Sequence, residues 1–301
     1  MSNVGGQAVM EGVMMRSPSA WAVAVRRPNG DIARVHRPVL SAAARHRVLR
    51  WPILRGIVAL VESLAIGFRA LAISASYAAD EGEGEDPGAE LSRTQLGLAF
   101  AVAIGFAVIL FKVSPAVLTH LLPIRSTGGF VVVEGLIRVA VFVAYLSLIS
   151  LLPDLRRVFQ YHAAEHKAIN AYEAGAELTP ETVQRFSKIH LRCGTAFLLW
   201  VMVIAVFVFA LFGRPGWTVL IASRVLLLPV IAGIAYEVIR FGGKHPQNPV
   251  VRTLLAPGLW LQSLTTREPT LDQIEVSIRA LQEVLGAEAA SAAGPRVEVM
   301  A

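Results

Sequence analysis

Cysteine is almost absent from this chain of 301 residues, which contains only Cys193. A single cysteine excludes an intramolecular disulfide, which fits a reducing compartment. Charge is also scarce, since 17% of the residues are charged against about 25% in an average soluble domain. With 54% hydrophobic residues and a mean hydropathy of +0.56, the composition predicts a membrane protein with several spans.

Several sequence signals are missing as well. The N-terminal stretch MSNVGGQAVMEGVMMRSP has no continuous apolar core of the signal-peptide type, so we expect an internal segment to direct membrane insertion. No Walker, Rossmann or nucleic-acid-binding motif is present, and no internal repeat. We therefore expect the lipid bilayer, and no nucleic acid, as a partner. The sequence assigns no protein partner and no oligomeric state.

Four stretches are apolar enough to span a membrane, which takes roughly 20 residues. They are Leu96–Leu122, Phe130–Leu152, Thr195–Phe212 and Thr218–Arg240. A fifth stretch, Ile53–Ala79, carries Arg55, Glu62 and Arg69 at seven-residue spacing, which places them on one helical face. That pattern favours a helix that lies in the membrane interface, or one packed with its polar stripe inward, over a span exposed to lipid.

The positive charges predict the orientation of these spans. If the fifth stretch does not cross, segments 1–95, 153–194 and 241–301 share one side and hold 11, 6 and 5 of the 28 Lys and Arg residues. Because Lys and Arg accumulate on the cytoplasmic side, this count predicts four spans with both termini cytoplasmic, in a bacterial inner membrane.

The expected fold is mainly α: a polytopic α-helical membrane protein with a small N-terminal β-hairpin region and a C-terminal cytoplasmic amphipathic helix. Alternating apolar residues on either side of Asn29-Gly30 predict the hairpin. Helical spacing predicts the C-terminal helix, with Thr270 or Asp272 as its cap. Its apolar positions are Leu271, Ile274, Ile278, Leu281 and Leu285. The expected segments are 1–50 (β-containing), 51–79 (amphipathic or interfacial helix), 80–95 (acidic linker), 96–152 (two spans), 153–194 (cytoplasmic), 195–240 (two spans), 241–287 (cytoplasmic) and 288–301 (disordered tail).

The stretch QYHAAEHKAINAYEAG holds two histidines four residues apart with a glutamate between them. On a helix, His162, His166 and Glu173 share one face and Glu165 flanks it, because each residue advances about 100°. Two histidines at this spacing can present nitrogens to one metal, and a glutamate between them can act as the general base, as in H-x-x-E-H zinc peptidases. The pattern predicts a metal site with Glu165 as its catalytic base.

A catalytic zinc takes three protein ligands, so a further ligand is expected nearby. His190 and Cys193 lie three residues apart just before the third span, in the same cytoplasmic segment as His162. Glu173 and Glu237 are alternative carboxylate ligands. The candidate metal ligands, with zinc as the expected ion, are therefore His162, His166, His190, Cys193, Glu173 and Glu237.

Three functions fit this pattern. The first is a zinc-type hydrolase at the cytoplasmic membrane face. The second is a non-catalytic scaffold or assembly factor in which the His/Cys cluster is structural. The third is a small-molecule transporter built around Glu134, Arg138 and Glu237, although the first two lie four residues apart on one face and also suit an internal ion pair.

Four stretches resemble the signatures of the YqhQ-like family of bacterial proteins: GGQAVMEGVMMRSP, LLPDLRRVFQYHAAEHKAINAYE, HLRCGTAFLL and APGLWLQSLTTREPTLDQIEVSI. The resemblance runs from about Gly5 to Leu285. It implies an integral membrane protein of a family of unknown function, whose members have been described as predicted metal-dependent enzymes. The family has proline where this chain has Leu191, which leaves the candidate ligands in place.

Overall fold

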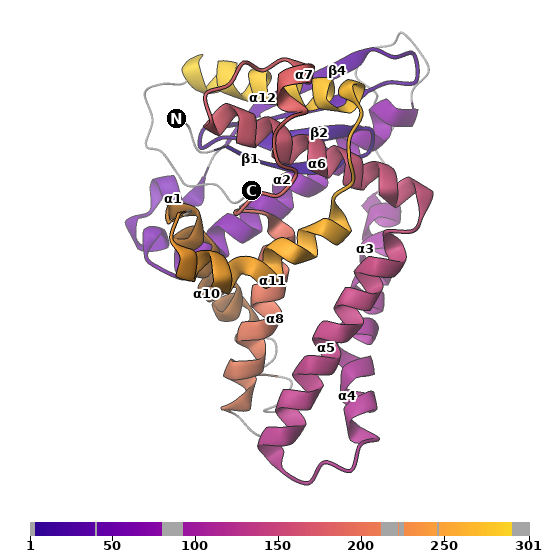
Figure 1. Ribbon diagram of the computed structural model, residues 1–301, viewed down its shortest axis with the longest axis vertical. Helices are drawn as coiled ribbons and strands as arrows, with labels where there is room; N and C mark the ends of the chain where they lie inside the picture. The colour runs from indigo at the N-terminus through magenta and orange to yellow at the C-terminus, as the bar shows by residue number, and fades with distance from the viewer. Residues whose placement is uncertain are drawn as a thin grey trace.

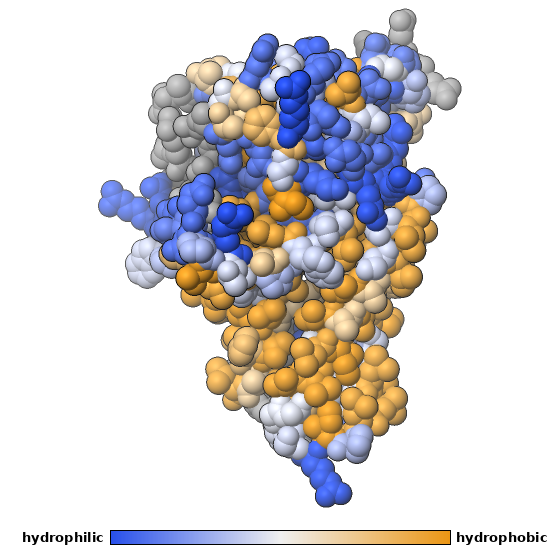
Figure 2. Space-filling view, viewed as in Figure 1, coloured by the Kyte–Doolittle hydropathy of each residue, from blue (hydrophilic) through white to orange (hydrophobic). Residues whose placement is uncertain are grey.

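The computed structural model describes residues 4–39, 41–79, 93–211, 222, 226–245 and 247–290. Figure 1 shows an upper half, in which helices cover a sheet, and a lower half of helices that extend along the long axis. On the face seen in Figure 2, the upper half is mostly hydrophilic and the lower half mostly hydrophobic. This division, like the composition, indicates association with a membrane.

The sheet is a four-stranded antiparallel meander in the order β1-β2-β3-β4. Its strands are β1 (Gly5–Val9), β2 (Gly12–Arg16), β3 (Ala20–Arg26) and β4 (Ile32–Pro38). The predicted hairpin is confirmed, since β3 and β4 flank a turn in which Gly30 has a φ of +94°. The first hairpin, β1–β2, was not predicted. Its turn contains Glu11 with a φ of +50°, and β2 is buried along its whole length, so no alternation of polar and apolar residues is visible.

The helices of the chain follow the sheet in this order: α1 (Ala42–Arg45), the 3-10 helix η1 (Arg47–Arg50), α2 (Leu54–Ala79), α3 (Arg93–Val108), the π-helix η2 (Ile109–Val113), α4 (Ser114–His120), α5 (Thr127–Ile149), α6 (Pro153–Glu173), α7 (Pro180–Val183), α8 (Gly194–Ala210), α10 (Leu228–Lys244), α11 (Pro249–Thr265) and α12 (Leu271–Ala290).

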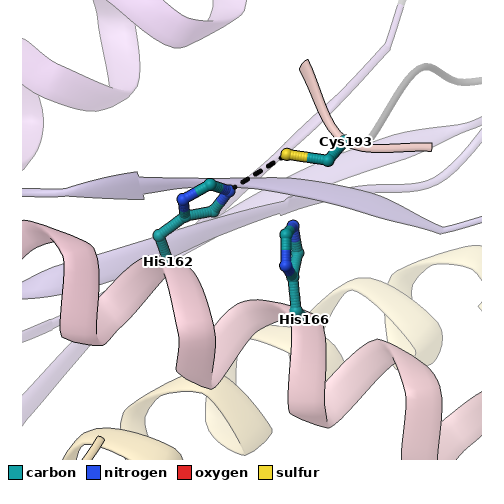
Figure 3. Close-up of side chains that lie close together, drawn as sticks. All are labelled: His162, His166 and Cys193. Atoms are coloured by element: carbon teal, nitrogen blue, oxygen red, sulfur yellow. Dashed lines mark hydrogen bonds between the residues drawn. The ribbon is translucent and has the colours of Figure 1, made fainter. Parts of the chain in front are cut away.

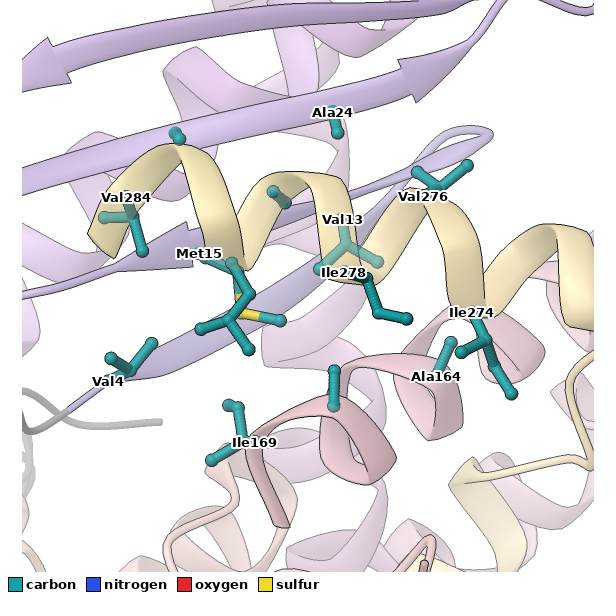
Figure 4. Close-up of a cluster of buried hydrophobic side chains, with 14 of the residues drawn as sticks. Val4, Val13, Met15, Ala24, Ala164, Ile169, Ile274, Val276, Ile278 and Val284 are labelled. Atoms are coloured by element: carbon teal, nitrogen blue, oxygen red, sulfur yellow. The ribbon is translucent and has the colours of Figure 1, made fainter. Parts of the chain in front are cut away.

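Both faces of the sheet are covered. Val13, Met15 and Ala24 contribute to a core shared with α6 and α12, part of which Figure 4 shows. The alternate residues Met14 and Val23 contribute to a second core with α2. Since successive side chains of a strand point to opposite faces, β2 and β3 must be apolar on both, which explains their continuous burial.

The C-terminal amphipathic helix is confirmed as α12. Thr270 and Gln273 form a capping box: the Gln273 amide donates to the Thr270 hydroxyl, and the Gln273 side chain accepts from the Thr270 amide. Ile274 and Leu281 are fully buried against the sheet and α6. The helix therefore packs on the protein itself, one of the two expected positions. Residues 291–301 of the expected tail, and residues 80–92 of the expected linker, lie outside the described residues.

Three helices of the described chain are long and apolar enough to cross a membrane: Leu54–Ala79, Ala101–His120 and Thr127–Ile149. The second and third correspond to the first two expected spans. The third expected span is the apolar but shorter α8, and the fourth lies partly outside the described residues, its remainder being α10. Within α5, Glu134 and Arg138 form the expected buried ion pair.

Candidate metal centre

The candidate centre is built on α6, which packs against the sheet on one side and against the segment that follows this helix on another. Pro153 occupies the first turn, where its missing amide hydrogen costs nothing, and Asp154 complements the positive end of the helix dipole. After the helix, Gly175 adopts a φ of +69°, the conformation that commonly ends a helix. The chain then returns along α6, so that Cys193 comes back beside His162 and His166, which lie 31 and 27 positions earlier.

His162, His166 and Cys193 form a compact group in which one ligand atom of each lies within 4.8 Å of the others. The two imidazole rings have centroids 4.4 Å apart, as the spacing of four residues predicts for one helix face. His162 Nε2 lies 3.3 Å from Cys193 Sγ. Figure 3 shows both rings rising from α6 toward the sulfur, which comes from the start of α8.

The backbone fixes the orientation of both rings. His162 Nδ1 lies 2.7 Å from the Thr265 carbonyl oxygen, and His166 Nδ1 lies 2.7 Å from the Lys188 carbonyl oxygen. A carbonyl only accepts hydrogen bonds, so each Nδ1 carries the hydrogen and each Nε2 is left to bind. Metal-ligating histidines almost always show this arrangement, with the second ring nitrogen bonded to a carbonyl or a carboxylate.

The segment that carries Cys193 is held in place by buried side chains. Gln262, fully buried on α11, accepts from the His190 amide at 2.9 Å and donates to the His190 carbonyl at 2.8 Å. From α6, Asn170 donates to the carbonyls of Ser187 and Ile189. The cysteine and the two histidines are therefore brought together by fixed contacts on both sides.

The electrostatics of the group favour a thiolate. Burial alone would raise the pKa of the Cys193 thiol, but the His162 and His166 rings outweigh it and hold that pKa well below its usual value. Burial likewise opposes charge on His162, yet the Cys193 sulfur and Glu165 outweigh it and raise the pKa of His162 to about 9. Cys193 is also the N-cap of α8, where the helix dipole stabilises negative charge. The thiolate is the form that ligates metals.

Glu165 is buried on α6, with only 2% of its surface exposed. One oxygen, Oε2, lies 3.9 Å from His166 Nε2, and the other, Oε1, has no hydrogen-bond partner among the described residues. A Cβ on Gly6 would come within 2.7 Å of Glu165 Cγ and 2.8 Å of the Met14 carbonyl oxygen. Strand β1 thus leaves room for this carboxylate only because residue 6 is glycine. An unpaired buried carboxylate oxygen is costly, and a ligand or a water molecule would satisfy it.

The remaining predicted ligands lie outside the group. The His190 ring centroid is 5.7 Å from that of His166, and its Nε2 faces Glu173 Oε2 at 3.5 Å. Partial burial would raise the pKa of Glu173, but His190 and Arg192, with which Glu173 is paired, outweigh this effect and hold that pKa below its usual value. Glu237 accepts two hydrogen bonds from Arg55. Both carboxylates therefore already have cationic partners.

Sequence reasoning missed the groups that orient the ligands. Gln262 and Gly6 lie in stretches that were noted as family signatures, but neither shows periodicity or spacing that points to the site. The Thr265 and Lys188 carbonyls are backbone groups, which every residue has. A polar glutamine within the apolar run APGLWLQSLT was the one available signal, because buried amides are normally hydrogen-bonded.

The donor set of one thiolate and two imidazoles fits a borderline-soft ion such as Zn²⁺. Donor atoms around a tetrahedral zinc lie about 3.3–3.6 Å apart, as follows from bond lengths of about 2.0–2.3 Å. A nitrogen–sulfur pair on one zinc lies at the upper end of this range, about 3.5–3.6 Å apart. The 3.3 Å separation of His162 Nε2 and Cys193 Sγ is slightly shorter than this, and the three ligand atoms lie within 4.8 Å of one another. The three residues could hold such an ion with one position left open.

These observations define a class: a membrane-associated, mainly helical protein with a His/His/Cys cluster between a small sheet and its apolar helices. The chain belongs to the YqhQ-like family, since the family model described as "Protein of unknown function (DUF1385)" matches residues 51–287. It is also similar to the uncharacterized protein YqhQ of Bacillus subtilis (strain 168), with 36% identity over 303 residues that cover 95% of this chain and 93% of the relative. No solved structure matches the chain. The resemblance recognised in the sequence motifs is thus confirmed.

Proposed function

We propose that the protein is a metal-dependent, zinc-type hydrolase whose centre lies at the cytoplasmic face of the bacterial inner membrane. The observation that carries the proposal is the convergence of His162 Nε2, His166 and Cys193 with both Nδ1 atoms already bonded to carbonyls. This pre-orientation is typical of ligating histidines. Any buried imidazole N–H needs a hydrogen-bond partner, so the convergence of the three ligand atoms is what distinguishes the group.

Each residue has a role in this proposal. His162, His166 and Cys193 hold the ion, which when bound supplies Lewis acidity toward a substrate carbonyl or phosphoryl oxygen. Glu165 is the general base: its Oε1 lacks a partner among the described residues, so it is available to accept a proton from an attacking water. His190, with its Nδ1 also lacking a partner in the described chain, adjoins the site through its contact with His166.

The proximity of the centre to the apolar half supports its placement at the membrane. Cys193 immediately precedes α8, an apolar helix, and α6 follows α5, a candidate span. A centre at this junction suits a substrate at the membrane surface. The excess of Lys and Arg in the segments around the site supports a cytoplasmic orientation, with four spans and both termini cytoplasmic.

Metal analysis of the purified full-length protein tests the proposal. We expect about one zinc per chain in the wild type, and none in a His162→Ala/His166→Ala variant. His36→Ala is the matched control, because His36 is an exposed histidine of β4 paired with Glu283, and it should retain the metal. Absence of bound metal from the wild type, after purification with zinc supplied, would contradict the proposal.

A structural role for the cluster is the second candidate, favoured by the burial of His166 and Cys193, which are 1% and 2% exposed. In that case the ion would join α6 to the start of α8 in a scaffold or assembly factor. A Glu165→Gln variant separates the two functions. If it keeps the metal but fails to complement a strain that lacks the gene, Glu165 takes part in chemistry. If it keeps the metal and complements fully, the structural role is supported.

A further inference from the structure

Helix α2 has the composition of a membrane span, yet its contacts are those of a helix bound to the sheet. Its 26 residues would extend about 39 Å at 1.5 Å per residue, enough to cross a bilayer. However, Ile66 and Ala70 are buried in the core that α2 shares with β2 and β3. Further along, the Tyr77 ring lies 4.9 Å from the guanidinium carbon of Arg27, at the end of β3. The second half of α2 therefore follows the sheet.

Ion pairs attach the polar side of α2 to the rest of the protein. Glu62 accepts from Arg16 of β2 at 2.7 Å and from the Ser41 hydroxyl at 2.8 Å. Arg55 donates to Glu237 of α10. The partner sheet also carries Arg34 and Arg37 on its exposed strand β4. If α2 crossed the hydrocarbon, it would draw these charged strands into lipid, where edge strands and charges are not tolerated.

The hydrophobic core gives an independent argument, which rests on the membrane localisation proposed above. One continuous core joins β2 and β3 to α6 and α12. A bilayer cannot divide a packed core, so these elements lie on one side, and the chain between β4 and α6 must cross an even number of times. The two candidate spans Ala101–His120 and Thr127–Ile149 satisfy this condition, whereas α2 would make a third crossing. In Figure 1, α2 lies at the level of α6, and α4, α5 and α8 extend below it.

We infer that α2 does not cross the membrane but docks on the surface of an anionic bilayer. Its outward face is an apolar stripe, Leu54, Val61, Leu64 and Phe68, whose side chains are 37–61% exposed. At about 100° per residue these four positions fall within an arc of about 80°. A helix of this kind, apolar on one side and fixed to the protein on the other, binds in the interfacial plane.

The flanking charge identifies the partner as anionic lipid. Trp51 and Val48, exposed by 62% and 54%, precede the stripe, and Arg47 and Arg50 lie beside them. From residue 47 to residue 79 the only acidic side chain is Glu62, which is paired with Arg16; the acidic stretch of the sequence begins at Asp80, after the end of the helix, so the basic flank is the N-terminal one. Tryptophan and arginine next to an apolar stripe are the residues that proteins place at the headgroup level. A second copy of this same basic face would repel it.

Cysteine accessibility in the full chain tests the absence of a crossing. In a Cys193→Ser background, single cysteines are placed at exposed positions: Arg37 on β4, Ala79 at the end of α2, Glu177 after α6, and Leu121 after α4. A membrane-impermeant maleimide is applied to inverted and to right-side-out vesicles. We expect the Arg37→Cys, Ala79→Cys and Glu177→Cys variants to react from one side of the membrane and the Leu121→Cys variant from the other. Reaction of Ala79→Cys from the same side as Leu121→Cys would overturn the inference.

Nitroxide labels on the apolar stripe of α2 test whether this face contacts lipid. Labels at Val61, Leu64 and Phe68 in phosphatidylglycerol-containing vesicles should be accessible to oxygen and protected from a water-soluble nickel complex, whereas a label at Arg37 should show the opposite. Accessibility of the stripe to nickel, or dipolar broadening between copies, would refute lipid docking. Both experiments measure membrane topology or insertion depth and do not depend on bound metal. Absence of metal from the protein would therefore contradict the proposed hydrolase but not this inference.

Discussion

Replacing Gln262 by leucine should weaken metal binding without touching any ligand. The glutamine side chain is fully buried and forms two hydrogen bonds with the backbone of His190, three residues before Cys193. Leucine has a similar size but no polar atoms, so the His190 amide and carbonyl would both lose their partner. Since each unsatisfied buried group costs about 1–3 kcal/mol, the free energy of unfolding should fall by about 2–6 kcal/mol.

The same change should loosen the position of the cysteine. Groups that orient ligands typically contribute a factor of about 10–100 to metal affinity. We therefore expect the zinc dissociation constant of Gln262→Leu, measured by competition with a chromophoric chelator, to rise by about 10–100-fold. The titration is run well below the unfolding temperature of the variant, so that the loss of affinity does not reflect unfolding.

Gln273→Leu is the matched control. Gln273 is also a buried glutamine, 4% exposed, but it caps α12 and bonds Gln160 rather than the cysteine segment. Loss of this cap should cost about 0.5–2 kcal/mol and leave zinc affinity unchanged. If Gln262→Leu binds zinc as tightly as the wild type, or if both variants lose affinity equally, the assigned role of Gln262 is wrong.

Three further predictions concern the centre and the apolar half. Gly6→Ala should displace the Glu165 carboxylate, because the added Cβ would lie 2.7 Å from Glu165 Cγ; metal content should be retained while complementation is lost, and full complementation would count against Glu165 as the base. In chelator-treated protein, the lowered pKa of Cys193 should give thiolate absorbance near 240 nm at pH 7, and His162→Ala should move the titration of this absorbance toward the ordinary thiol pKa of about 8.5. The stability contributed by the raised pKa of His162 is complete below the unfolded pKa of about 6.5 and is lost as the pH rises through about 9. The stability contributed by Cys193 is complete above about pH 8.5 and is lost as the pH falls through the lowered pKa of its thiol. Arg138→Leu should remove the cationic partner of the buried Glu134 on α5 and cost about 3–5 kcal/mol, seen as a lower unfolding temperature in detergent. Replacing both residues by leucine should restore most of this loss, and equal loss in the single and double variants would argue against this account of the pair.

Local chemistry made part of the fold predictable. Asn29-Gly30 favours a tight turn regardless of its surroundings, and the spacing of Ile274, Ile278 and Leu281 specifies the buried face of α12. The β1–β2 hairpin was not predictable in this way, because both of its faces are covered and β2 is uniformly buried. Composition alone makes α2 a candidate span, but the spacing of Arg55, Glu62 and Arg69 already favoured a helix that lies in the interface or packs with its polar stripe inward. The contacts of α2 with the sheet show that it is held against the protein.

For the candidate centre, the sequence indicated the residues on one helix but could not select among the distant ones. The spacing of His162 and His166 is a local property of α6, and their rings do lie side by side. Whether His190 or Cys193 completes the group depends on how the return segment turns, and Gln262 and Asn170 determine that turn from other elements. Glu237 was a reasonable candidate by position along the chain, yet Arg55, 182 residues earlier, occupies it.

X-ray absorption at the zinc edge of the purified full-length protein tests the central claim most directly. The account predicts a first shell containing one sulfur at about 2.3 Å and two imidazole nitrogens at about 2.0–2.1 Å. Cys193→Ser should remove the sulfur contribution. A zinc shell without sulfur in the wild type, or no bound zinc, would contradict the assignment of His162, His166 and Cys193 as a metal centre.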